Sequence, residues 1–301
     1  MSFSLSNPHL RLFVGAGLIS FSPVFVELVE VSPTTSAFYR VFIGGMALAL
    51  FLLVTGRRIG FPLSAWRFVA LAGAFYAADL WFWHRSINYI GPGLGTLLAN
   101  LQVFFMMAGG MLLLNQRPGR LQWLSVPLAI VGLTMIVGVD WQSLAPGYRA
   151  GVVLGVLTAV SYAGYLLSMR RTLVDTKNAV PTREVAIMSL TAAGMLAVSA
   201  FVEGESLAIA TKADLTWLLC YGLLAHAVGL MFIVSSLTQV TATETGIALL
   251  LQPSLSFVWD VLIFGRAFTG LEVAGAAITL AAIYLGSRSN SKDAKRTASK
   301  A

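Results

Sequence analysis

Long apolar runs recur along the whole chain of 301 residues, separated by short clusters of Gly, Pro and charged residues. A run of about 18 residues or more forms a helix that can cross roughly 30 Å of hydrocarbon, where only a helix or a closed barrel satisfies its own backbone hydrogen bonds. The expected fold is therefore an all-α polytopic membrane protein with short connections. The runs predict ten transmembrane helices near 11–29, 35–55, 66–87, 94–114, 121–139, 150–169, 184–203, 214–237, 245–264 and 270–287.

The composition supports a membrane protein and excludes several kinds of site. Hydrophobic residues make up 57% of the chain and charged residues only 11%, whereas about 25% of an average soluble domain is charged. The single cysteine, Cys220, excludes an internal disulfide and a cysteine cluster for a metal. No metal site and no cofactor are expected. Only Arg11 precedes the first apolar run, so we interpret this run as a retained first helix rather than a cleaved signal peptide.

The distribution of Lys and Arg predicts the orientation. With a cytoplasmic N-terminus, fifteen of these residues fall in cytoplasmic segments and four in outer segments. Because cytoplasmic loops carry the basic excess, both termini are predicted to be cytoplasmic, in a plasma membrane of the bacterial inner-membrane type. The net charge of +7 then comes mainly from basic residues that set the orientation in the membrane, and no nucleic-acid partner is expected. The basic tail at 289–301 is predicted to be disordered, either solvated or touching anionic lipid.

An internal repeat connects the two halves of the chain. An offset of 150 residues places "ANLQVF" (99–104) on "LLLQPS" (249–254), and thus Gln102 on Gln252. The offset maps helices three to five onto helices eight to ten in order. Five helices per half is an odd number, so the second half must enter the membrane from the opposite side. The sequence therefore predicts two inverted five-helix repeats, at 1–145 and 146–288, a recurrent design of secondary transporters with a midplane site.

These segments resemble a known family. "FYAADLWFWHRSI" and "GTLLANLQVFFMMAGG" in the first half, and "GIALLLQPSLSFVWDVLIFG" in the second, are similar to EamA-type drug/metabolite transporters. The chain departs from the common pattern in helix four, where Val103 stands opposite Pro253 and Gln116 replaces an acidic residue. The resemblance implies ten helices, alternating access and export of small metabolites such as amino acids. The aromatic-rich third helix is most similar to the aromatic amino acid exporters.

The third helix carries the most informative polar residue. Tyr76, Asp79 and Trp83 are spaced to share one helix face. A carboxylate in the bilayer core costs about 2.5–3.5 kcal/mol, so Asp79 should face a cavity or a partner. Asp79 could bind a substrate ammonium or a proton, with Tyr76 and Trp83 packing on the substrate. It could equally be structural, either hydrogen-bonded to helix backbones or paired with Arg40 or His84.

Other charged residues lie nearer the ends of the predicted helices. Arg40 could extend to the outer surface, bind a substrate carboxylate or pair with Glu27. His84 and Arg85 are expected at the membrane interface. Asp260 is either an interfacial residue or part of a gate.

Uncharged polar residues and prolines complete the predicted site. Polar side chains inside a span need hydrogen-bond partners, and so they either bind substrate or hold helices together. His226 is a candidate for a proton relay, with packing as the alternative. Pro23 and Pro253 interrupt backbone hydrogen bonds in opposite halves and are candidate hinges. The further candidates for substrate binding are Asn100, Gln102, Tyr162, Tyr165, His226, Gln252 and Ser256.

The favoured function is a secondary transporter that exports aromatic or large neutral amino acids by alternating access through a central cavity. Alternative cargoes are cationic drugs, sugars or nucleotides, and a remote alternative is a non-transporting membrane scaffold. The chain has no H-E-x-x-H motif for a metalloprotease and no G-x-x-x-x-G-K-[ST] motif for ATP, so we expect neither an enzyme nor an ATP-driven pump. The expected partners are a small-molecule substrate and the bilayer, with the protein as a monomer.

Overall fold

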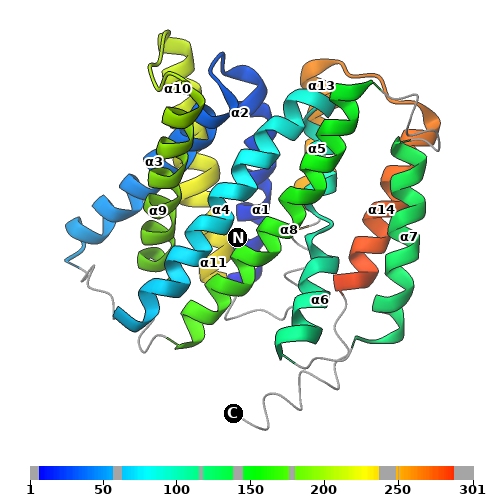
Figure 1. The fold of residues 1–301 in the computed structure, drawn as a ribbon, viewed down its shortest axis with the longest axis horizontal. Helices are drawn as coiled ribbons and strands as arrows, with labels where there is room; N and C mark the ends of the chain where they lie inside the picture. Colours follow the sequence, from blue (N-terminus) through cyan, green and yellow to red (C-terminus); the bar gives the residue numbers. More distant parts are fainter. Residues whose placement is uncertain are drawn as a thin grey trace.

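The structure is a computed structural model that describes residues 7–56, 63–114, 118–137, 145–175, 180–236, 249 and 251–287. These residues form ten helical spans and contain no strand, which confirms the expected all-α fold (Figure 1). Six spans are long and apolar enough to cross a membrane by length and composition, and three more are shorter apolar helices. The basic tail predicted at 289–301 lies outside the described residues. The spans are α1–α2 (Pro8–Ser20, Ser22–Leu28), α3 (Pro33–Val54), α4 (Leu63–Ile90), α5–α6 (Pro92–Ala99, Gln102–Leu114), α7 (Arg120–Val137), α8 (Pro146–Asp175), α9 (Pro181–Glu203), α10–η1–α11 (Lys212–Cys220, Tyr221–Leu230, Met231–Ser236), α13 (Leu251–Phe264) and α14 (Gly270–Ser287).

Prolines mark the start of several spans. Helices α1, α3, α5 and α9 each begin with a proline, which has no N–H to lose in the first turn and has a φ angle suited to a helix. Helix α9 ends at Gly204, whose φ of 70° is left-handed and suits glycine. Local sequence chemistry thus sets where these four spans begin.

Three spans are interrupted near the middle of the bundle. The first breaks at Phe21, just before Pro23 in the first turn of α2, and the fourth breaks between α5 and α6 at Asn100 and Leu101. The eighth winds into a ten-residue π-helix, η1, a form that often occurs at functional sites. Pro253 lies in the first turn of α13, where a proline disturbs little. The interruptions surround the centre of the protein.

The helix pairing supports the inverted repeat. The third span packs along the sixth (α4 on α8), the second along the seventh (α3 on α9), and the fifth along the tenth (α7 on α14). The first packs on the eighth (α1 on η1 and α11), and the fourth on the ninth (α5 on α13). If each span of the first half is exchanged with the corresponding span of the second half (the first with the sixth, the second with the seventh, and so on), the same five packing pairs result. The halves therefore interlock around a pseudo-twofold axis, as the 150-residue offset predicts.

Two close backbone crossings join the halves. A Cβ added at Gly15 of α1 would lie 2.7 Å from the carbonyl oxygen of Gly229, and one added at Gly44 of α3 would lie 2.9 Å from that of Gly222. Small residues allow such close approach between helices in a membrane. Both crossings involve η1, which lies against the first half of the chain.

The end of the bundle at the top of Figure 1 contains α2, α10, the end of α4 and the starts of α3 and α5. We call it the outer end, because the distribution of Lys and Arg predicts that it faces away from the cytoplasm.

Candidate functional site

A cavity of about 60 Å³ lies between the two halves. This space holds a few water molecules, since one water needs roughly 10–15 Å³. Its wall comes from both halves: α1, α2, α3, α4, α5 and α6 on one side, and α8, η1 and α13 on the other. Seven of the ten residues predicted to bind substrate line it: Tyr76, Asp79, Trp83, Asn100, Gln102, Tyr162 and Gln252.

The other three predicted residues lie behind the wall. The Tyr165 ring packs 4.8 Å from that of Tyr76, between centroids. The Ser256 hydroxyl donates to the Gln252 carbonyl oxygen at 2.8 Å. His226 is fully buried and contacts the Tyr76 hydroxyl through Nδ1 at 3.3 Å. These residues contact residues of the cavity wall without lining the cavity themselves.

His226 links three helices at the centre of the protein. Its Nε2 lies 2.7 Å from the Ser189 hydroxyl of α9, and its Nδ1 faces Tyr76 of α4. A Cβ on Gly44 would collide with the imidazole ring. The ring therefore fills the crossing between the halves, and the contact with Tyr76 connects it to the cavity wall.

Arg40 also lines the cavity, which is compatible with the alternative that it binds a substrate carboxylate. It is 6% exposed, so the expectation that it extends to the outer surface is wrong. Its Nη1 donates to the Tyr221 hydroxyl at 2.9 Å, and the Tyr221 and Trp83 ring centroids lie 5.0 and 5.5 Å from its Cζ. The alternative partner, Glu27, is exposed. The sequence feature that could have placed Arg40 in the interior is its position within a span, because exposing a cation to lipid there is energetically costly.

Asp79 lines the same cavity and is 6% exposed. Among the described residues it has no hydrogen bond, and no cation lies within 4 Å of its carboxylate, so the predicted pairs with Arg40 and His84 do not form. His84 contacts the Leu80 carbonyl oxygen at 2.7 Å and the Tyr221 hydroxyl at 3.2 Å. It is fully buried in the protein, and its expected place at the membrane interface stays a prediction.

Buried polar atoms without partners gather around the cavity. Nine buried side-chain nitrogen or oxygen atoms of the described residues lack a hydrogen-bond partner, and five of them belong to residues that line the cavity. Buried polar groups normally have partners, so this concentration points to a polar ligand or water in the cavity. The five atoms are Ser22 Oγ, Arg40 Nε, Thr96 Oγ1, Gln102 Oε1 and Gln252 Nε2.

Contacts between the halves close the bundle on the outer side of the cavity. The Trp259 ring stacks on Phe21 with centroids 4.6 Å apart, and its Nε1 donates to Ser20 Oγ at 3.0 Å. Asp260 accepts the Gly93 N–H at 3.0 Å and is 1% exposed. The contact joins the start of α5 to α13, and the interfacial and gate alternatives for Asp260 both stay predictions.

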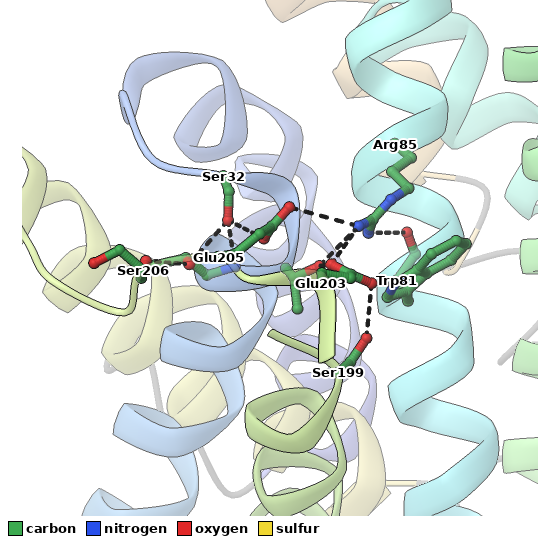
Figure 2. Close-up of polar contacts among 9 residues, drawn as sticks. Ser32, Trp81, Arg85, Ser199, Glu203, Glu205 and Ser206 are labelled. Carbon is green, nitrogen blue, oxygen red and sulfur yellow. Dashed lines mark hydrogen bonds and ion pairs between the residues drawn. The ribbon is translucent and has the colours of Figure 1, made fainter. Parts of the chain in front are cut away.

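A second set of contacts, which we call the outer ion cluster, consists of Arg85, Glu203 and Glu205 (Figure 2). Arg85 Nη2 lies 2.8 Å from Glu203 Oε2 and 3.8 Å from Glu205 Oε1. Glu203 also accepts from Trp81 Nε1 at 2.6 Å, and Glu205 from the Ser32 hydroxyl. The cluster ties α3 and α4 of the first half to the end of α9 in the second. Sequence reasoning missed Glu203 and Glu205, because 118 residues separate Arg85 from Glu203.

Comparisons with known proteins agree with this architecture. A solved structure titled "Crystal structure of protein" superposes with a TM-score of 0.68 at 18% identity, over 97% of this chain and 99% of that chain, which is a likeness of fold. No curated protein matches. The profile of the EamA-like transporter family matches residues 9–138 and 149–288, one match in each half. The two matches span nearly the whole chain, which therefore belongs to the EamA-like transporter family.

Proposed function

We propose that this protein exports amino acids with aromatic or large neutral side chains, by alternating access through the cavity between its halves. Membership of the family implies secondary transport of small metabolites or drugs, and it implies no enzymatic activity. The amino acid cargo, the direction of transport and the resemblance to aromatic amino acid exporters belong to the proposal. So do a bacterial inner membrane, cytoplasmic termini, the repeat boundary near residue 145 and a monomeric state.

The observation that carries the proposal is the mixed chemistry of the cavity wall. One cation, Arg40, and one anion, Asp79, line the same space. The aromatic side chains of Tyr76, Trp83 and Tyr162 lie in the same wall. Opposite charges next to aromatic surface suit a zwitterion with an apolar side chain.

The size of the cavity and the contacts at the outer end support alternating access. Pockets that hold drug-sized ligands measure about 300–1,000 Å³, whereas this cavity measures about 60 Å³. Cargo therefore enters only when the halves separate, and the contacts of Trp259 and Asp260 hold them together at the outer end. The proposed hinges are the interruption of the first span near Pro23 and the start of α13 at Pro253, because a proline leaves a backbone carbonyl without its usual partner and lets the helix segments move. The driving force is a gradient of protons or of cargo.

A second candidate cargo is a cationic drug. The carboxylate of Asp79 has no cation within 4 Å among the described residues, and Tyr76 and Trp83 lie in the same cavity wall. A carboxylate flanked by aromatic faces attracts an organic cation. Arg40 in the same wall disfavours a cargo that is only cationic.

The test is counterflow in proteoliposomes loaded with single amino acids. The wild-type protein is expected to take up aromatic or large neutral amino acids saturably, and Trp83→Ala is expected to weaken apparent affinity about tenfold or more, because an aromatic face is lost. Asp79→Asn is expected to reduce uptake by removing the charge that faces the ammonium group.

Two exposed residues supply matched controls for this test. Trp123→Ala removes an exposed tryptophan on α7, and Glu30→Gln removes an exposed carboxylate. Both should transport like the wild type, and melting temperatures identify variants that fail to fold. If a monodisperse wild-type protein moves no amino acid, the cargo proposal is wrong, and uptake of organic cations by the same preparation would favour the second candidate.

A further inference from the structure

Arg40 is a buried cation that forms no ion pair with any residue that the structure describes. It is 6% exposed inside a membrane span, and no carboxylate of a described residue lies within 4 Å of it. A charge in this environment costs about 2.5–3.5 kcal/mol on insertion scales unless it is compensated. Aromatic rings compensate part of this cost, since the Cζ of Arg40 lies 5.0–6.0 Å from the centroids of Tyr221, Trp83 and Tyr76.

The guanidinium retains hydrogen-bonding capacity next to the cavity. It carries five N–H donors in a planar fork. Among the described residues its one hydrogen bond runs from Nη1 to the Tyr221 hydroxyl, and Nε has no partner. Nearby rings cannot satisfy donors along the edge of the fork. That edge matches the two oxygens of a carboxylate, which arginine binds with paired hydrogen bonds.

A relay of hydrogen bonds holds Arg40 in position. Nδ1 of His84 must donate to the Leu80 carbonyl oxygen at 2.7 Å, because a carbonyl only accepts. In the neutral ring Nε2 is then an acceptor, and the Tyr221 hydroxyl donates to it at 3.2 Å. The Tyr221 oxygen is thereby free to accept from Arg40. This chain of hydrogen bonds holds the guanidinium group of Arg40 in position and does not neutralise its positive charge.

Asp79 lies on the same cavity but not in an ion pair with Arg40. Both residues line the space, yet their charged groups are more than 4 Å apart. A direct salt bridge would satisfy both groups and leave neither for cargo. The separation instead leaves two opposite charges facing one small space, and an α-amino acid carries its ammonium and carboxylate groups on one carbon atom.

We propose that Arg40 is the anchor for the carboxylate of the cargo, with Tyr221 and His84 as positioning residues and Asp79 facing the ammonium group. The transported class is therefore α-amino acids with a free carboxylate, and amides, esters and decarboxylated amines are rejected. Transport of this cargo rests on the proposed function, whereas binding of a carboxylate at Arg40 can be tested independently of transport.

The experiment measures binding to the purified full-length protein by ligand-dependent shifts of the melting temperature. The probes are L-phenylalanine, L-phenylalaninamide, 3-phenylpropionate and phenethylamine, titrated at constant pH. Wild-type protein is expected to bind L-phenylalanine about tenfold or more tightly than the amide, as expected for a charge-assisted hydrogen-bonded pair. 3-Phenylpropionate should bind more weakly than phenylalanine but should still depend on Arg40.

Variants separate an anchor from a merely structural arginine. Arg40→Gln should bring the apparent dissociation constants of phenylalanine and its amide to within about twofold of each other. Arg40→Lys should keep part of the preference, because lysine retains the charge without the planar fork. Tyr221→Phe should weaken phenylalanine binding more than amine binding. Arg67→Gln, at an exposed site on α4, is the matched control and should behave like the wild type.

The outcomes distinguish this proposal from the proposed function. If wild-type protein binds the amide as tightly as phenylalanine, Arg40 is not a carboxylate anchor, even if counterflow shows amino acid export. This comparison needs no variant, so it holds even if Arg40→Gln fails to fold. If the carboxylates bind in an Arg40-dependent way but no amino acid is moved in counterflow, the anchor stands and the proposed function fails.

Discussion

Removing Glu203 is expected to open the cavity to reagents applied from the outer side. Glu203 accepts hydrogen bonds across the junction of the halves from Trp81, Arg85 and Thr34 at 2.6–2.8 Å, and it accepts one from Ser199 of its own helix at 2.9 Å. Glu203→Ala removes all of these acceptors at once. A hydrogen bond to a charged group contributes about 1.5–3 kcal/mol to stability. The Glu203 side chain is 25% exposed, so water weakens these hydrogen bonds and the total free energy lost is smaller than their sum. We expect about a tenfold shift in population towards a form open at the outer end.

Cysteine labelling measures this shift directly. Cys220 is the only cysteine, so Cys220→Ser gives a cysteine-free background. Ala99→Cys then places one thiol in the cavity wall. The rate of labelling by a membrane-impermeant thiol reagent from the outer face should rise about tenfold in Glu203→Ala. Equal labelling rates with and without Glu203 would show that the outer ion cluster is not part of the closure, and Glu30→Gln, at an exposed outer position, controls for loss of charge alone.

A methyl group added at Gly44 is expected to cause the largest loss of stability. The new Cβ would collide with the His226 ring and lie 2.9 Å from the Gly222 carbonyl oxygen. Overpacking of this kind costs about 1–3 kcal/mol, because tightly packed helices cannot move apart locally. The melting temperature of Gly44→Ala in detergent should therefore fall by several degrees, and transport should fall with it because η1 is displaced. Gly194→Ala is the matched control, since a Cβ there meets no atom within 4 Å.

A double-mutant cycle identifies the cause of the Gly44→Ala effect. His226→Ala alone loses the contacts with Tyr76 and Ser189, and so it also destabilises the protein. In the double variant the space left by the imidazole accepts the new methyl group, and the combined loss should be clearly less than the sum of the single losses. The remaining contact with Gly222 prevents full rescue. Strictly additive losses of stability would mean that a collision with the His226 ring is not the cause of the Gly44→Ala effect.

Much of the architecture was predictable because a membrane imposes few solutions. Each apolar run must form a helix, so the ten spans follow from their lengths, and an odd number per half forces the inversion of the repeat. The same constraint located part of the cavity wall. Asp79, Gln102 and Gln252 lie within spans, where lipid cannot satisfy them, and all three line the cavity between the halves. Their direction follows from the cost of exposing a polar group to lipid.

The chain alone determined the class of fold, the number of spans, the predicted orientation and the polar candidates, because these depend on local hydrophobicity and charge. Only the tertiary structure decided which candidates meet. The depth and rotation of α3 place Arg40 beside Tyr221 instead of at the surface, and the arrangement of the halves brings Arg85 to Glu203 across 118 residues. Such contacts depend on how whole helices pack, and no short stretch of sequence contains both partners. The physical reason is that spacing along a helix sets which residues share a face, whereas packing between helices sets what that face meets.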